Sequence, residues 1–350
     1  MPKLQWVFLL GCIICCSSAD AQTTSVKPGS GKLRRLDFFS NERPVEITLE
    51  TDYKKMQGAK VKGVFQPAVV TIQLPDSAAI TENIEVFARG EFRRQTCAMP
   101  GIMMNFKTPN SPRLSSLKKL KLVCGCGSSG YEQQLLLSEY LIYRMYNMLT
   151  DLSFKTKLAK VKYKDSRNKM KEYTQYAFFI EDVDDLAARN NFKEESKRTY
   201  LTEQTDRQTM TLVGMFQFMI GNTDWSIPNY HNIKLLRPAK DSFGVPLVVP
   251  YDFDFAGLVN APYALPHVDL PIEKVTDRLY RGFPRSMEEL EKTVALFNDK
   301  RQAFTDLIRN FDLIDRGDRE TMIKYLNEFY EIINNKRRLQ DAFINNARKQ

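Results

Sequence analysis

Apolar and polar residues alternate along much of the first half of the chain, which is the pattern of half-buried β-strands. The predicted strands cover residues 45–53, 68–75, 83–92, 101–108 and 117–125. Residues 155–182 carry two further alternating runs around a polar turn, which predicts a hairpin. We therefore expect an antiparallel sheet in this half of the chain.

Helical periodicity takes over in the rest of the sequence. Residues 131–149 are apolar over most of a helical surface, which indicates a buried helix. Residues 205–221 predict a second helix, and Gly221 suits its C-terminus. The end of the chain predicts three amphipathic helices. Together the patterns predict a β-rich region over 36–180 and a mainly helical region over 181–350.

The stretch 216–259 holds most of the candidate chemistry. Two short strands, 233–236 and 245–251, are predicted within it. Asp224, Asn229, His231 and Asn232 precede the first strand, and Asp252 and Asp254 follow the second. If the strands pair, these side chains converge at one end of the pair and offer the oxygen ligands that Mg²⁺ or Mn²⁺ prefers. The plainer interpretation is that Asp and Asn serve here as caps and turn residues.

The motifs GNTDW, HNIKLL and VPYDFDFAGLV resemble those of the CotH-like atypical kinases, first known from spore coats, and of related secreted bacterial proteins. The resemblance implies a two-lobed α+β fold of the atypical protein-kinase type, with a β-rich N-terminal lobe and a mainly helical C-terminal lobe. It implies an ATP- and divalent-metal-dependent phosphotransferase, with Mg²⁺ or Mn²⁺. The implied partners are a nucleotide and a protein or other hydroxyl acceptor.

By the same resemblance, Asp224 is the loop aspartate that orients the acceptor hydroxyl and takes its proton. Asn232 and Asp252 are the implied metal ligands, with Asp254 close behind. The interval from Asp224 to Asn232 is longer than the usual kinase gap, which Asn229 would satisfy. Asn232 is preferred because it opens the predicted strand, and Asn229 remains the alternative.

Four residues outside the central stretch complete the expected nucleotide site. Arg89, followed by Gly90, resembles the family's loop whose basic residues approach the phosphates, and Lys107 is assigned to the same task. Glu139, in the predicted helix, is the expected partner of Lys107. Glu181 ends the predicted hairpin at the hinge position, where the adenine is expected. The plainer alternatives are a common turn, solvent-facing charges and a helix N-terminal acid.

Two other function classes remain open. The glycine cluster in CGCGSSG carries cysteines and lies in the wrong place for a nucleotide loop. This favours a catalytically degenerate kinase-like protein that acts in binding or surface assembly, although the family dispenses with such a loop. A metal-dependent hydrolase using Asp224, Asp252 and Asp254 would need further ligands. The chain has only two histidines, which makes this class the weakest.

The N-terminus has the pattern of a signal peptide over residues 1–21, with Lys3 before a short apolar core and a small-x-small site ending at Ala21. A polar linker is predicted over 22–35. We therefore expect an exported protein, periplasmic, cell-surface or secreted, with no transmembrane segment in the mature chain. A lipobox-like Leu9-Leu10-Gly11-Cys12 leaves a lipoprotein as the second interpretation.

Cysteine and charge refine this picture. The predicted mature chain keeps Cys97, Cys124 and Cys126. An oxidising compartment favours a bridge from Cys97 to Cys124 or Cys126. The net charge of +9 suits an anionic ligand such as a nucleotide. Lysine and arginine are spread along the whole chain, and we expect no nucleic-acid partner.

Overall fold

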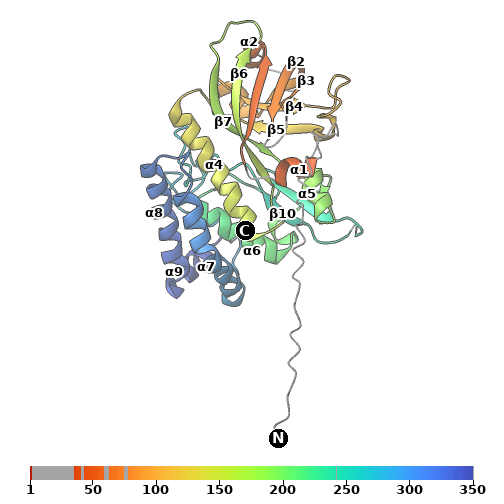
Figure 1. Ribbon diagram of the computed structural model, residues 1–350. Coiled ribbons are helices and arrows are strands. Elements are labelled where there is room, and N and C mark those ends of the chain that lie inside the picture. The colour runs from red at the N-terminus through yellow and green to blue at the C-terminus, as the bar shows by residue number, and fades with distance from the viewer. Residues whose placement is uncertain (2–34, 41–42, 59–62, 75–77, 242, 350) are drawn as a thin grey trace. The chain divides into compact units, whose positions relative to one another are not determined.

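The computed structural model describes residue 1 and residues 35–40, 43–58, 63–74, 78–241 and 243–349 (Figure 1). Residues Gly31–Gln350 form one compact unit. The predicted signal peptide and almost all of the predicted linker lie outside the described residues. Arg35, the last residue of that linker, begins the first helix.

Seven strands close into a barrel in the order β1-β2-β3-β4-β5-β7-β6. Their bounds are β1 (Val45–Thr51), β2 (Gln66–Gln73), β3 (Ile80–Arg89), β4 (Gly101–Asn105), β5 (Lys119–Val123), β6 (Thr156–Asp165) and β7 (Tyr173–Ile180). All neighbours are antiparallel except β1 and β6, which pair in parallel with Val45 opposite Ala159. Burial alternates along β1, β2 and β3, so one side of each strand faces a shared apolar interior.

The expected two-lobed, kinase-like fold is wrong, because seven strands form a closed barrel, with most of the long helices in the C-terminal part of the chain. The individual strand predictions are confirmed. Their assembly was mispredicted because an open sheet and a barrel show the same alternation of apolar and polar residues. Closure depends on the pairing of β1 with β6, whose partners Val45 and Ala159 are far apart in the sequence.

Four long helices lie among the described residues. They are α4 (Gly130–Leu149), α6 (Arg207–Ile220), α7 (Met287–Arg309) and α8 (Arg316–Ile333). The shorter helical elements are α1 (Arg35–Ser40), α2 (Tyr53–Gly58), α3 (Glu91–Thr96), α5 (Val183–Arg189), α9 (Lys336–Gln340), two 3₁₀ turns at Ser115–Leu117 and Thr202–Gln204, and a π-helical turn at Asp341–Asn345. The periodicity predictions for α4, α6 and the C-terminal helices are confirmed. The rings of Tyr146 in α4 and Phe216 in α6 are 4.6 Å apart, so these two helices share a core.

Gly221 ends α6 with a φ of 67°, as the sequence predicts for a helix C-terminus. A Cβ atom there would lie 2.0 Å from the hydroxyl oxygen of Tyr325. Both the left-handed backbone and the packing therefore require glycine at this position. The Gly221 carbonyl accepts a hydrogen bond from the N–H of Gly257 at 3.1 Å, which ties the end of α6 to the acidic stretch after β10.

A second, three-stranded sheet has the order β10-β9-β8, with β8 (Phe192–Glu195), β9 (Ile233–Pro238) and β10 (Leu247–Pro250). β9 and β10 are antiparallel with Ile233 opposite Pro250, so the two strands predicted in the central stretch do pair. The N–H of Tyr251 donates to the carbonyl of Asn232 at 3.0 Å. The loop before β9 therefore lies beside the turn after β10.

A disulfide joins Cys97 and Cys126, whose Cα atoms are 4.7 Å apart, and this confirms one of the two predicted pairings. Cys124 is a buried free thiol, and burial raises its pKa to about 11. Such a thiol is almost wholly protonated at neutral pH and therefore a poor nucleophile.

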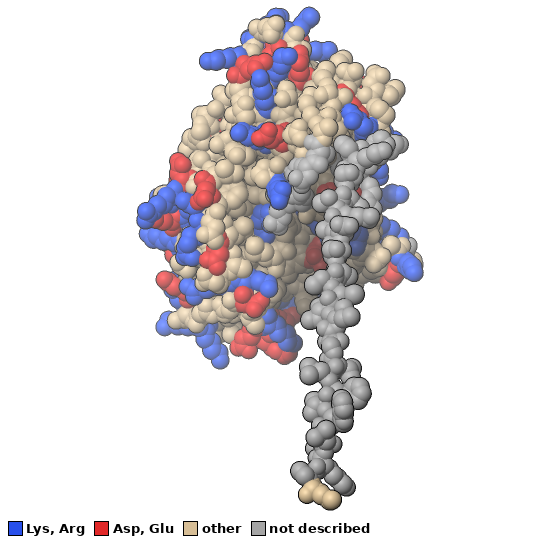
Figure 2. Space-filling view, viewed as in Figure 1, with Lys and Arg blue, Asp and Glu red and all other residues tan. Residues whose placement is uncertain are grey.

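Charged residues of both signs are interspersed on the face shown in Figure 2. That face therefore carries no single extended basic surface among the residues described. Within the described ranges, no helix is both long enough and apolar enough to cross a membrane.

Candidate functional site

Asp224 lies in the loop between α6 and β9, and both of its carboxylate oxygens are held in place. Oδ1 is 2.8 Å from Nε2 of His231, and Oδ2 accepts a hydrogen bond from Nδ2 of Asn232 at 2.8 Å. The N–H of Asp224 donates to Oδ1 of Asn222 at 3.0 Å. Because an aspartate carboxylate only accepts hydrogen bonds, the Nε2 of His231 is the donor. The loop thus presents Asp224 in one orientation.

Asn232 and Asp252 have left-handed backbones, with φ of 52° and 63°. Non-glycine residues adopt this region at a cost, and such residues cluster at functional sites. Nδ2 of Asn232 also donates to the carbonyl of Asp224 at 2.8 Å. The amide nitrogen is therefore engaged with Asp224, and the amide oxygen remains as a ligand atom.

Asp254 lies two residues beyond Asp252 and already has partners. Its Oδ2 accepts from the hydroxyl of Tyr263 at 3.2 Å and from Nη2 of Arg93 at 3.4 Å. Burial lowers the pKa of Arg93, but the charges of the neighbouring carboxylates, Asp254 foremost, outweigh it and raise the pKa overall. Arg93 therefore remains charged beside Asp254.

Glu139 lies in the middle of α4 and is buried. Its carboxyl group joins those of Asp252 and Asp254, and we call these three groups the acidic cluster. Neither of its carboxylate oxygens has a hydrogen-bond partner among the described residues, and the N–H of Phe253 lies near without completing one. Burial and the charge of Asp254 raise its pKa, against the opposing charge of Arg93. Burial, with Asp254 adding to it, also raises the pKa of Asp252 to about 6. The cluster thus holds more negative charge than Arg93 neutralises.

The carboxylates of Asp224, Asp252 and Asp254 line one cleft of about 520 Å³. Its lining residues include Arg89, Arg93, Asp224, His231, Asn232, Asp252 and Asp254. The structure therefore brings together five residues predicted from the sequence: Arg89, Asp224, Asn232, Asp252 and Asp254. Asn229, the alternative to Asn232, lines a neighbouring cleft that Asp252 does not reach.

Basic side chains gather next to the acidic cluster. Lys121 lies on the same side of β5 as Val123, which lines the cleft. Burial lowers the pKa of Lys121 to about 8, and nearby Arg89 adds to this effect. Lys234 also acts on Lys121, and its Nζ is 2.7 Å from a carboxylate oxygen of Glu194. Lys121 therefore lies near Lys234 and near Arg89, and Arg89 lines the cleft and acts on Asp252.

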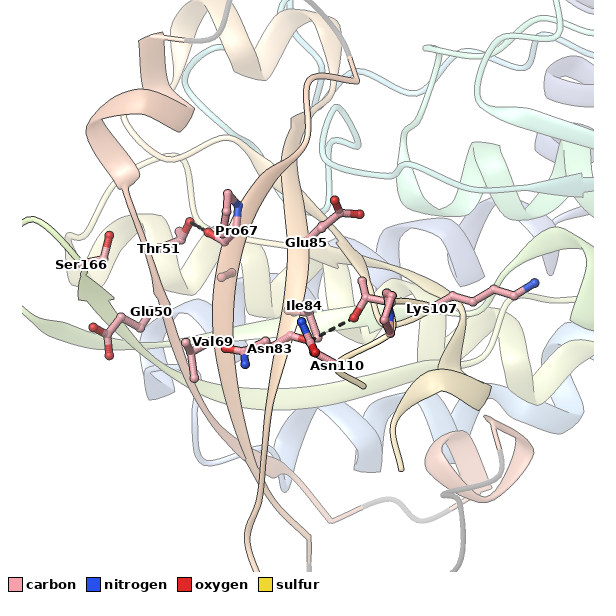
Figure 3. Close-up of a pocket in the computed structure, with 13 residues that line it drawn as sticks. Glu50, Thr51, Pro67, Val69, Asn83, Ile84, Glu85, Lys107, Asn110 and Ser166 are labelled. Atoms are coloured by element: carbon pink, nitrogen blue, oxygen red, sulfur yellow. Dashed lines mark hydrogen bonds between the residues drawn. The ribbon is translucent and has the colours of Figure 1, made fainter. Parts of the chain in front are cut away.

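The structure does not bring Lys107 to this cleft, nor to Glu139. Lys107 lines a separate cavity beside exposed residues of β3, together with Asn83, Glu85 and Asn110 (Figure 3). The basic group whose charge acts on Glu139 is Arg93. The prediction failed because Lys107 follows β4 at the end of the barrel away from the cleft, whereas Arg93 is presented by α3, which the strand pattern does not predict.

Glu181 is likewise not available to a nucleotide. Its carboxylate is buried, forms an ion pair with Nε of Arg189 at 2.9 Å, and accepts from the N–H of Lys155 at 3.0 Å. The Glu181 N–H donates to the Lys155 carbonyl at 2.9 Å. These contacts attach Arg189, at the end of α5, to the barrel, so the Glu181 side chain has a structural role.

Two residues of the cleft, Arg93 and His231, and Lys121 beside it were given no role by the sequence analysis. His231 carries a signal in the sequence, because it directly precedes Asn232 in the HNIKLL motif. Lys121 and Arg93 carry none, since each is one of several basic residues in its segment. The glycine cluster 125–130 packs on β7 instead, where Nε2 of Gln175 donates to the carbonyl of Gly127 at 3.1 Å.

The residues present fit a divalent cation that a ligand helps to hold. Within the described part of the chain, no three His, Cys, Asp or Glu side chains form a preformed metal site. Mg²⁺ commonly takes only one or two protein carboxylates and completes its shell with phosphates and water. The carboxylates of Asp252 and Asp254, with the amide oxygen of Asn232, are a donor set of this kind, and their unneutralised charge favours a cation.

A second cleft of about 650 Å³ lies on the other side of Asp224 and shares Asp224, His231 and Phe255 with the first. Trp225 and Val275 line it, and Leu265, at its edge, is 74% exposed. Asp224 thus stands in the wall between a charged cleft and a partly apolar one.

No family model matches this chain, and no curated protein matches it.

Proposed function

We propose that this protein is an ATP- and divalent-metal-dependent phosphotransferase that moves a phosphoryl group onto a hydroxyl acceptor outside the cytoplasm. The observation that supports it most is that one cleft is lined both by the carboxylates of Asp224, Asp252 and Asp254 and by the cations Arg89 and Arg93. A metal–polyphosphate complex needs both kinds of group at once. The proposal rests on this site and on the resemblance to CotH-like kinases, and it does not require a kinase-like fold.

In this reaction Asp224 accepts the proton of the acceptor hydroxyl. His231 and Asn232 each hold one of its carboxylate oxygens at 2.8 Å, so the base is oriented before the acceptor arrives. Pre-orientation matters because a catalytic group gains most when its geometry needs no adjustment during the reaction. The second cleft gives the acceptor a route to Asp224 that leaves the first cleft to the nucleotide.

Arg89, which lines the cleft, and Lys121, which lies near it, bind the phosphates through their charge. Asn232, Asp252 and Asp254 would hold a divalent cation, which would neutralise charge on the transferred group. Glu139 and Arg93 lie close to these ligands, and their charges act on the carboxylates of Asp252 and Asp254. The exported location follows from the signal-peptide pattern of residues 1–21.

A second candidate function is a catalytically degenerate protein that uses the same cleft for binding or surface assembly. The observation that favours it is the state of Asp254, whose carboxylate already has Arg93 and Tyr263 as partners. The chain itself therefore supplies part of the charge and the hydrogen bonds that a metal ion would otherwise provide to this carboxylate.

One experiment separates the two functions. The purified mature protein is incubated with ATP and Mg²⁺ or Mn²⁺, its melting temperature is recorded, and its mass is then measured. A phosphotransferase shows a metal-dependent thermal shift and a phosphorylated product on itself or an added acceptor. A thermal shift without any transfer supports the binding protein, and no shift at millimolar ATP contradicts the proposed nucleotide site.

A further inference from the structure

The short helix α3 forms part of the wall of the charged cleft, although it buries no side chain fully. It spans Glu91–Thr96 between β3 and β4, and none of its residues is buried. Gly90, which precedes it, has a φ of 80°, so the chain enters the helix through a turn that favours glycine. Something other than burial must therefore hold α3 in place.

The Cys97–Cys126 disulfide holds the end of this helix. Cys97 directly follows α3, and Cys126 lies in the loop between β5 and α4. The N–H of Met99 donates to the Cys126 carbonyl at 3.0 Å, so the backbone is also attached at this point. Both cysteines are partly exposed, which makes the bridge accessible to solvent reagents.

α3 delivers one side chain into the cleft, and that side chain spans from the bridge region to the acidic cluster. Nη1 of Arg93 donates to the carbonyl of Cys124 at 2.6 Å, two residues before Cys126. Nη2 of the same guanidinium reaches Oδ2 of Asp254 at 3.4 Å. The neighbouring Phe92 places its ring 5.9 Å from Phe255. The bridge and Arg93 therefore attach α3 to the same segment.

We propose that the Cys97–Cys126 bridge is the device that positions Arg93 against Asp254, and that the affinity of the cleft for a metal–nucleotide complex depends on this bridge being closed. Reduction by a dithiol transfers two electrons and two protons to the two cysteine sulfurs, and the dithiol becomes a disulfide. The end of α3 is then released. The statement about affinity rests on the proposed function, whereas the statement about the position of Arg93 does not.

The position of Arg93 is tested first, without any ligand. Hydrogen exchange of residues 90–97 is measured in the wild-type protein, in the double variant C97S/C126S, and in C124S. C124S is the matched control, because it makes the same Cys→Ser change while the bridge stays closed. We expect at least tenfold faster exchange in C97S/C126S and in dithiothreitol-treated wild type, with C124S unchanged. Equal exchange in all four samples overturns the proposal.

The consequence for affinity is tested with Mn²⁺·ATP. We expect Arg93→Met and C97S/C126S each to weaken binding at least tenfold, and the combined variant to be no weaker than either alone, because the bridge acts through Arg93. If the combined variant loses affinity by the product of the two single losses, the bridge does not act through Arg93. Wild-type affinity for Mn²⁺·ATP in C97S/C126S also overturns the coupling. A wild-type protein that does not bind Mn²⁺·ATP refutes the proposed function and the affinity statement, while the exchange data still decide the position of Arg93.

Discussion

The hydroxyl oxygen of Tyr143 accepts a hydrogen bond from the backbone N–H of Asp252 at 2.8 Å. Tyr143 is buried in α4, and its ring lies 4.8 Å from that of Phe253. Asp252 has a left-handed backbone with a φ of 63°, a conformation that needs support from its surroundings. Helix α4 therefore fixes the backbone that presents the acidic cluster.

We expect Tyr143→Phe to destabilise the protein by about 1–3 kcal/mol, since a buried N–H then loses its partner. Tyr146→Phe is the matched control one helical turn away, because the Tyr146 hydroxyl is buried with no hydrogen-bond partner among the described residues. Its loss should be neutral or slightly stabilising. Chemical denaturation of both variants checks this, and equal effects would show that the Tyr143–Asp252 bond adds nothing.

Asp252→Asn should separate function from folding. Burial and the charge of Asp254 disfavour the ionised form of Asp252, whose pKa is raised to about 6. Removing that charge should leave the fold intact and at neutral pH leave its stability unchanged or slightly raised. The thermal shift produced by ATP with Mg²⁺ or Mn²⁺ should disappear, and so should transfer. Asp318→Asn, at an exposed site on α8, is the control. Unfolding of Asp252→Asn would mean that Asp252 is a structural turn residue.

Asp224→Ala should abolish transfer while nucleotide binding stays within a factor of about two. The rate of phosphoryl transfer should fall by about 10²-fold to 10⁴-fold, which is the usual contribution of a positioned general base. Calorimetric titration with ATP and metal, beside a phosphorylation assay, measures both quantities. Asn229→Ala is the control in the same loop and should retain activity. A parallel loss of binding in Asp224→Ala would place Asp224 among the ligand contacts instead.

The lowered pKa of Lys121 predicts how the affinity for ATP and the free energy of unfolding change with pH. Its pKa in the folded protein is lowered to about 8 from an ordinary value of 10.5. Above about pH 8 the folded protein loses this proton, and with it a charge that attracts phosphate, so affinity for ATP should fall. The unfolded chain keeps the proton up to about 10.5, so it binds more protons between these values. The free energy of unfolding therefore rises with pH across this window, by up to about 3 kcal/mol.

Lys121→Arg tests this assignment, because a guanidinium stays charged throughout the range. Its affinity for ATP should be flat between pH 7 and 9.5, whereas wild-type affinity falls. Lys118→Arg, at an earlier basic position before β5, is the control and should follow the wild type. A wild-type affinity that is independent of pH would remove Lys121 from the phosphate site.

The sequence by itself determined the elements and the order of the central motif. The alternation along residues 45–53 and the periodicity of 131–149 are local patterns, and each predicts a strand or a helix that the structure contains. Asp224, Asn232 and Asp252 could be predicted to meet because two adjacent strands, joined by a short turn, pair almost unavoidably. The Cys97–Cys126 bridge was likewise one of two predicted pairings.

Only the tertiary structure decided how the barrel closes and which basic residues reach the cleft. The parallel pairing of Val45 with Ala159 sets the closure, and no local pattern specifies that register. The same closure places Lys121 near Arg89, and α3 brings in Arg93, while Lys107 is left at a different cavity. The physical reason is that alternation tells which side of a strand is buried, whereas the charge that each exposed side chain meets depends on contacts between segments far apart in the chain.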